Sequence, residues 1–153
     1  MSFKTIRGQF RTLLISLTSG GNTILHEVIS TPELKFNGYP AAYIVPSDLE
    51  SEYETTIENE RVYAFIIRIF HETKKTGIAT AIDVLEDVVD AVIDALDQED
   101  KKGASTRTVG VSLPANYVYL GINATPGIWA ELPGEQLVMA EIKVRVKVSY
   151  DAS

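Results

Sequence analysis

Residues 60–73, ERVYAFIIRIFHET, decide how this chain folds. Read with a period of two, one face carries Val62, Ala64, Ile66, Arg68 and Phe70, and the other carries Tyr63, Phe65, Ile67 and Ile69. Because β-branched and aromatic residues dominate both faces, the pattern predicts a strand inside a sheet that is covered on both sides. Arg68 is the exception, and a charge at such a position needs a partner or a route to solvent.

An acidic segment leads directly into this strand. Residues 48–60, DLESEYETTIENE, contain six carboxylates and no lysine or arginine. The six are Asp48, Glu50, Glu52, Glu54, Glu58 and Glu60. The contrast between this segment and the apolar strand makes the six acids candidates for an interaction surface.

The last long segment, residues 137–150, also alternates. Its apolar face is formed by Val138, Ala140, Ile142, Val144, Val146, Val148 and Tyr150. Its other face carries Met139, Glu141, Lys143, Arg145, Lys147 and Ser149. This pattern predicts a half-buried antiparallel strand with a cationic outer face. Lys143, Arg145 and Lys147 are therefore candidates for a subunit interface, because they could pair with the acidic segment of another copy.

Two further segments have the periodicity of amphipathic helices. The first has a possible cap at Ser2 and apolar residues up to Leu17, and the glycines of residues 19–22, SGGN, indicate its end. The second covers about residues 78–97. Its predicted buried stripe is Ile78, Ile82, Leu85, Val89, Val92, Ile93 and Leu96. Its opposite face carries Asp83, Glu86, Asp87, Asp90, Asp94 and Asp97, which fits solvation better than a metal cage.

Shorter signals complete the chain. Residues 41–45, AAYIV, read as a strand that pairs with residues 60–73, whereas the state of residues 23–29 stays open. Residues 109–122 read as a strand interrupted by Pro114. Turns are expected at residues 125–127 and 133–134, on either side of Trp129, which fits a core anchor and an interface anchor equally well.

This order of elements predicts one α+β domain over residues 1–153, with a mixed, mostly antiparallel β-sheet flanked by two main α-helices. The length of 153 residues is enough for a real core. The lack of cysteine excludes disulfides and thiolate metal sites. The N-terminus lacks a signal-peptide pattern, and no apolar run approaches the roughly 20 residues of a membrane span. We therefore expect a cytoplasmic protein, or part of a particle assembled in the cytoplasm, with no membrane partner.

The sequence gives no support for catalysis. It contains no GxGxxG, GxxxxGK[ST] or GxSxG motif, and its two histidines, His26 and His71, lack metal-binding spacing. We expect no enzymatic activity, no cofactor and no metal. The net charge of −7 argues against a general nucleic-acid binder, although a negative surface would let DNA pass without sticking.

Four phrases resemble a known family. They are FNGYPAA at 36–42, PSD at 46–48, ESEYETT at 50–56 and ENERVYAF at 58–65. Together they look like the tail terminator, or tail-completion, proteins at the head–tail joint of long-tailed bacteriophages. The resemblance is strongest over residues 36–73. It is looser over the helix at 78–97 and over the final strand.

The resemblance implies a structural virion protein without enzymatic activity. Such a protein forms a ring, typically a homohexamer, that caps the tail tube, stops polymerisation of the tube protein and presents a docking surface to the head connector. DNA passes through the ring without specific binding. The acids of residues 48–60, or those of the second helix, would then line the lumen, and changing Glu50, Glu52 and Glu54 to Lys should impair DNA ejection.

Two alternatives stay open. A head-completion or tail-adaptor protein of the same particle has a similar size and build. A small cytoplasmic enzyme or ligand-binding domain would need convergent polar groups, for which Arg68, His71 and Glu72 at the end of the central strand are the candidates.

Overall fold

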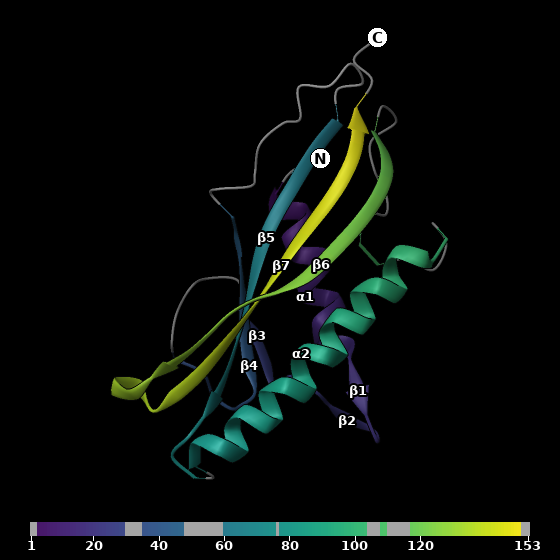
Figure 1. The fold of residues 1–153 in the computed structure, drawn as a ribbon. Coiled ribbons are helices and arrows are strands. Elements are labelled where there is room, and N and C mark those ends of the chain that lie inside the picture. Colours follow the sequence, from purple (N-terminus) through teal and green to yellow (C-terminus); the bar gives the residue numbers. More distant parts are fainter. Residues whose placement is uncertain are drawn as a thin grey trace.

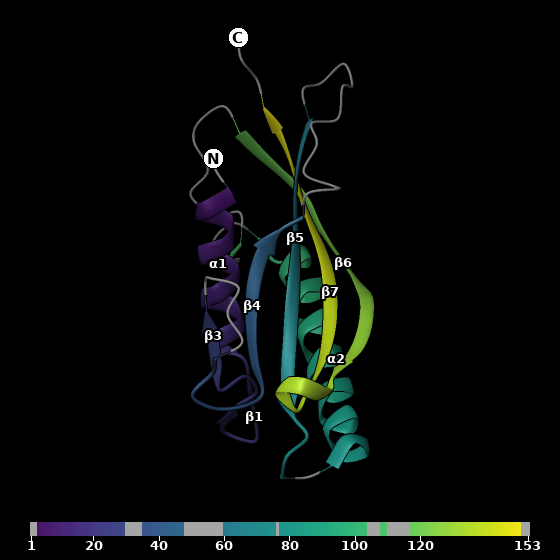
Figure 2. The ribbon, with the colours of Figure 1, turned by 90° about the vertical axis from the view of Figure 1, so that its left-hand side faces the viewer.

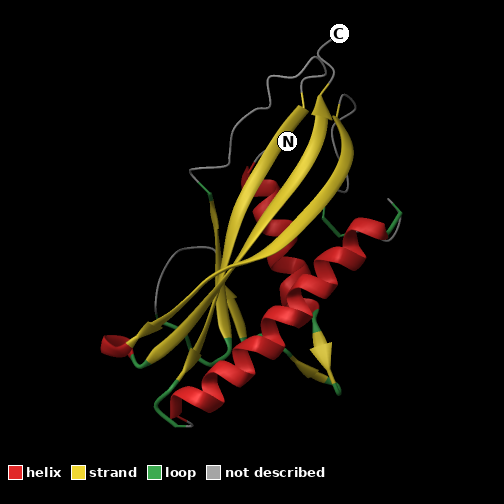
Figure 3. Ribbon diagram, viewed as in Figure 1, coloured by secondary structure: helices red, strands yellow, loops and turns green. Residues whose placement is uncertain are grey.

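The computed structural model describes residues 3–29, 35–47, 60–75, 77–103, 108–109 and 117–150. They form two helices, a small two-stranded sheet and a five-stranded sheet (Figures 1 and 3), which confirms the predicted α+β class. In chain order the elements are α1 (Phe3–Ser16), β1 (Thr18–Ser19), β2 (Asn22–Thr23), β3 (Glu27–Ile29), β4 (Ala41–Pro46), β5 (Glu60–Glu72), α2 (Gly77–Lys101), β6 (Tyr117–Leu132), a 3-10 turn (Pro133–Glu135) and β7 (Leu137–Tyr150).

The main sheet has the strand order β3-β4-β5-β7-β6, with the predicted central strand in the middle. β5 is antiparallel to both of its neighbours, and its pairing with β4 runs from Ala41 opposite Phe70 to Pro46 opposite Phe65. The predicted pairing of residues 41–45 with residues 60–73 is therefore confirmed. β3 runs parallel to β4, which makes the sheet mixed.

Both helices lie on the same face of this sheet, which we call the inner face (Figure 2). On this face of β5 the side chains of Tyr63, Phe65, Ile67 and Ile69 are buried. The ring of Phe10 from α1 meets the ring of Phe65 edge-on, with 5.5 Å between centroids. α2 crosses β5, β7 and β6, where the alternating valines of β7 complete the core, as their period of two predicts.

The opposite, outer face of β5 is covered less completely than the sequence predicts. Ala64 and Phe70 are buried there, but Val62, Ile66 and Arg68 are only half-buried. Phe70 belongs to a second apolar cluster with Tyr43 and Leu137, against which Phe36 packs. The ring centroids of Phe36 and of Tyr43 each lie 5.4 Å from that of Phe70. The predicted cover is therefore complete on the inner face of β5 and only partial on its outer face.

α2 extends four residues beyond its predicted end because its last turns are tied to the following segments. The fully buried carboxylate of Glu99 accepts hydrogen bonds from the backbone N–H groups of Thr108 and Val109, the second at 2.8 Å. Asp100 accepts the backbone N–H of Ile122 at 2.8 Å. These bonds fix the C-terminal end of α2 against the start of β6. At the other end Ile78, predicted as buried, is 44% exposed.

Two predicted turn signals have a different role in the structure. α1 ends at Ser16, and Gly20 and Gly21 form the tip of the β1–β2 hairpin with φ values of 60° and 85°. Positive φ at both central residues is what a type I′ two-residue hairpin turn needs, so the glycines form this turn and do not cap a helix.

Residues 125–127, also predicted as a turn, lie inside β6, where the register with β7 shifts between Pro126 and Trp129. The segment is therefore a strand with a bulge. β6 begins at Tyr117, so only the last part of the predicted strand at 109–122 is a strand in the described residues, and Pro114 lies outside them.

Candidate functional site

The three cationic side chains predicted for the final strand lie together on the outer face of β7. Lys143 and Arg145 are exposed and Lys147 is half-buried. The register places them opposite Ile66, Ala64 and Val62 of β5, and opposite Thr125, Asn123 and Gly121 of β6. The predicted cationic outer face is therefore present, and its cross-strand partners on β5 and β6 are uncharged residues.

Two recesses lie on this surface. One has a volume of about 160 Å³ and is lined by Asn123, Thr125, Lys143 and Arg145. The other, which we call the outer recess, measures about 270 Å³ and contains Val62, Leu120, Arg145 and Lys147 among its lining residues. Leu120 is 45% exposed and the nearby Val118 is 58% exposed. The outer recess therefore combines exposed apolar surface with positive charge.

The acidic candidates are almost all beyond the part of the chain that the structure describes. Asp48, Glu50, Glu52, Glu54 and Glu58 lie in residues 48–59 and stay a prediction. Glu60 begins β5, where its backbone pairs with Ser149 of β7. The end of the acidic segment thus lies two residues along β5 from Val62, the register partner of Lys147.

Arg68 has the partner that its position requires. Its Nε donates to Oε2 of Glu141 at 2.7 Å, and its Nη1 donates to the hydroxyl of Tyr43 at 3.1 Å. Burial of the guanidinium works against its charge, but the hydrogen bonds to Glu141 and Tyr43 outweigh this and raise the pKa of Arg68. Glu141, on the face predicted to be solvated, is only 6% exposed. The ion pair therefore stabilises the sheet, and its charged groups bind each other and not a ligand.

The candidate ligand pocket at the end of the central strand is not formed, because its side chains do not converge. The candidates are Arg68, His71 and Glu72. Arg68 and His71 lie three residues apart on β5, so their side chains leave opposite faces of the strand. Burial lowers the pKa of His71, and the charge of Glu72 opposes that shift. Nδ1 of His71 is buried without a hydrogen-bond partner among the described residues, and its ring meets that of Tyr39 edge-on, with 6.5 Å between centroids. These three side chains therefore do not form a shared site.

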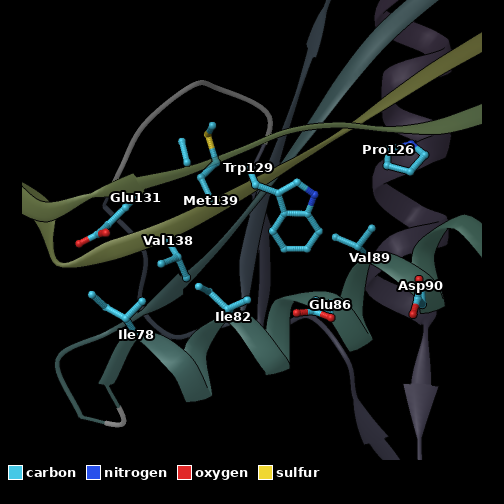
Figure 4. Close-up of a pocket in the computed structure, with 11 residues that line it drawn as sticks. Ile78, Ile82, Glu86, Val89, Asp90, Pro126, Trp129, Glu131, Val138 and Met139 are labelled. Atoms are coloured by element: carbon cyan, nitrogen blue, oxygen red, sulfur yellow. The ribbon is translucent and has the colours of Figure 1, made fainter.

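A groove larger than either recess lies between α2 and the β6–β7 hairpin (Figure 4). We call it the Trp129 groove. It has a volume of about 560 Å³ and is lined by Ile78, Ile82, Glu86, Val89, Asp90, Pro126, Trp129, Ala130, Glu131, Val138 and Met139. The indole of Trp129 points from the bulged part of β6 toward α2, and it is 42% exposed. An open tryptophan over an apolar floor is typical of a binding surface.

The rim of the Trp129 groove is acidic. Glu86, Asp90 and Glu131 are exposed, and the first two belong to the acidic face predicted for the second helix. The remaining acids of that face, Asp83, Asp87, Asp94 and Asp97, are also exposed. The helix therefore presents a band of negative charge next to exposed apolar surface.

The sequence points to Glu86 and Asp90, on an acidic helix face, and separately to Trp129, but it does not bring them together or point to Glu131. Ile78, predicted as buried, is exposed at the groove, and the predicted turn at residues 125–127 is a bulged part of β6. The sequence signal for this groove is Trp129 itself. It lies in a segment rich in small residues and proline, which is typical of an edge strand.

Two negative findings apply to the part of the chain that the structure describes. No three His, Asp or Glu side chains gather there to hold a metal ion. No described helix is long and apolar enough to cross a bilayer.

Comparison with known proteins does not assign a family. No family model matches the sequence, and no curated protein is significantly similar to it.

Proposed function

We propose that this chain is a structural protein of a phage virion that forms a ring at the head-proximal end of the tail. In this role it ends polymerisation of the tail tube and provides the docking surface for the head connector. The proposal rests on the resemblance of residues 36–73 and on one structural observation. Positive charge lies on the outer face of the sheet and negative charge on the exposed side of α2, and exposed apolar side chains lie beside both.

That separation favours an assembly subunit over an isolated domain. The outer sheet face carries Lys143, Arg145 and Lys147, whereas the exposed side of α2 is acidic. β6, a sheet edge of 16 residues among the described strands, exposes Val118, Leu120, Ile128 and Trp129. Long edge strands with apolar side chains invite contact with another chain, and monomeric proteins usually blunt them.

The acidic side of the molecule also suits the passage of DNA. A surface that neutralises no phosphates releases no counterions, and therefore holds DNA weakly. The carboxylates of residues 48–60 and of α2 are the candidates for the lumen. Changing Glu50, Glu52 and Glu54 to Lys is expected to leave assembled particles intact but to impair DNA ejection. Normal ejection and infectivity would remove these acids from the lumen.

The direct test adds the purified protein to polymerising tail tube protein of the same phage and follows tube length by electron microscopy. A terminator gives shorter tubes with added density at one end. An adaptor or head-completion protein leaves tube length unchanged and binds the connector. Tubes and connectors that both fail to bind the protein would overturn the proposal.

A ligand-binding domain is the second candidate, and the volume of the Trp129 groove is the observation in its favour. A groove of about 560 Å³ is within the size range of small-molecule sites. Its polar groups, however, are solvated carboxylates at the rim, and no polar group in its lining is buried. A ligand-binding protein would stay monomeric and would be stabilised by a small cationic apolar compound, whereas a terminator subunit would bind tubes.

A further inference from the structure

Two surfaces of this protein match each other in chemistry. The Trp129 groove offers apolar side chains framed by the carboxylates of Glu86 and Asp90. The outer recess offers the apolar side chains of Val62 and Leu120 framed by Arg145 and Lys147, with Val118 exposed nearby. Each surface therefore presents the charge that the other lacks.

The two surfaces lie at different places on the same β6–β7 ribbon. The Trp129 groove uses Pro126, residues 129–131 and residues 138–139, close to the connection between the strands and beside α2. The outer recess uses residues 120–123 with Arg145 and Lys147, farther along the ribbon, on the face away from the helices. Because they occupy separate positions, one beside α2 and the other away from the helices, one molecule cannot bring its own two surfaces together.

We propose that the Trp129 groove of one molecule binds the outer-recess surface of a second copy of this chain. Apolar side chains, led by Trp129, form the centre of the contact, and carboxylates of α2 face Arg145 and Lys147 around it. Charge complementarity selects this occupant, because a groove with an acidic rim rejects another acidic groove and accepts a cationic surface. The inference rests on the proposed function and deepens it by naming the surfaces that join the subunits.

The contact is heterologous, since it joins two different surfaces. A heterologous contact leaves one free groove and one free outer recess on every pair, so that further copies add in the same direction. Such a series closes into a ring where the rotation per subunit allows it. The edge strand β6 lies within the contact, which also explains why it exposes Leu120 and Trp129.

Three variants test the contact in the full chain. The groove variant is Glu86→Lys with Asp90→Lys, and the recess variant is Arg145→Glu with Lys147→Glu. The matched control is Asp94→Lys with Asp97→Lys, which makes the same change of charge on exposed residues of the same helix, outside the groove lining. Far-UV circular dichroism and urea unfolding verify that each variant is folded.

Sedimentation velocity then measures self-association. The groove and recess variants are each expected to associate at least ~100-fold more weakly than the natural chain, because like charges meet in the contact. An equal mixture of these two variants should regain assembly, since each reversed surface then finds one of opposite sign. The control variant should assemble like the natural chain.

A fourth variant, Trp129→Ala, tests the apolar centre without changing charge. Truncating a central aromatic anchor is expected to weaken association by ~10-fold to 100-fold. Assembly that is unaffected by the charge reversals, or a mixture that fails to regain it, would overturn the contact. A natural chain that is monomeric at every concentration, both alone and with tail tube protein, would also overturn it.

The same proteins separate this inference from the proposed function when they are added to tail tube protein. Variants that assemble and cap tubes as the natural chain does would refute the contact and leave the terminator role intact. A natural chain whose assembly follows the predicted variant pattern but which ignores tubes would support the contact and refute the terminator role.

Discussion

Replacing Arg68 with Met should destabilise the fold by leaving the carboxylate of Glu141 without its ion-pair partner. The side chain of Glu141 is 7% exposed and that of Arg68 is 31% exposed. Removing one member of a fully buried pair typically costs about 3–5 kcal/mol, and the partial exposure of Arg68 reduces our expectation to about 2–3 kcal/mol. For a chain of this size that corresponds to a fall of roughly 5–10 °C in Tm.

The assay is urea unfolding followed by far-UV circular dichroism on Arg68→Met, Glu141→Gln and the double variant. The double variant should be less destabilised than the sum of the single variants by about 1–2 kcal/mol, because it removes both charges. Lys75→Met is the matched control. Lys75 lies 3.9 Å from Glu72 and its side chain is 78% exposed, so its loss should cost less than about 0.5 kcal/mol.

Two results would refute this reasoning. One is an Arg68→Met variant as stable as Lys75→Met, which would mean that the carboxylate finds water or another donor. The other is a double variant whose loss equals the sum of the single losses, which would mean that Arg68 and Glu141 stabilise the sheet independently.

Three further predictions concern other parts of the fold. Glu99→Ala removes the acceptor of two backbone N–H groups at the end of α2 and should lower the free energy of unfolding in urea by about 2–4 kcal/mol. The control Asp97→Ala, on the exposed side of the helix, should change it very little. Equal losses would contradict a stabilising role for the hydrogen bonds of Glu99. Gly127→Ala brings a Cβ within 3.1 Å of the Cβ of Glu141 and should lower stability by about 1 kcal/mol, so an unchanged Tm would show that the bulge adjusts freely. Burial lowers the pKa of His71 below its unfolded value of about 6.5, so the stability from the neutral ring is full above that pH and is lost as the pH falls toward the folded pKa. His71→Phe should therefore flatten the pH dependence of unfolding below about pH 6.5, and an unchanged slope would exclude His71 as its source.

The long elements could be predicted from the sequence because their periodicity is local. β5 and β7 show a period of two, and α2 shows the spacing of a helix, over enough residues to make the signal clear. Fold class, the central position of β5 and the cationic face of β7 all follow from these patterns. The sequence predicts that Arg68 needs a partner or a route to solvent. That the partner is Glu141 depends on the register between β5 and β7.

The wrong predictions concern glycine and proline, because these residues fit several kinds of turn and bulge. Gly20 and Gly21 fit the end of a helix as well as the tip of a hairpin, and only the pairing of Thr18 with Thr23 selects the hairpin. The Pro126-Gly127 pair signals a turn locally, but pairing with β7 continues on both sides of it. The strand therefore survives with a bulge, because long-range pairing outweighs the local preference.

The Trp129 groove could not be predicted because its parts come from two elements that meet only in the folded chain. Glu86 and Asp90 look like an ordinary solvated helix face, and Trp129 sits between apparent turns. Their proximity depends on how α2 crosses the β6–β7 hairpin, which no local pattern encodes.

The solution mass of the purified natural chain, measured by light scattering on a size-exclusion column with and without tail tube protein, tests the central claim most directly. The account predicts a ring, formed by the chain alone or on addition of tubes, with a mass that is a small multiple of 16.8 kDa. A strict monomer in both samples, with no protein bound to the tubes, would contradict it.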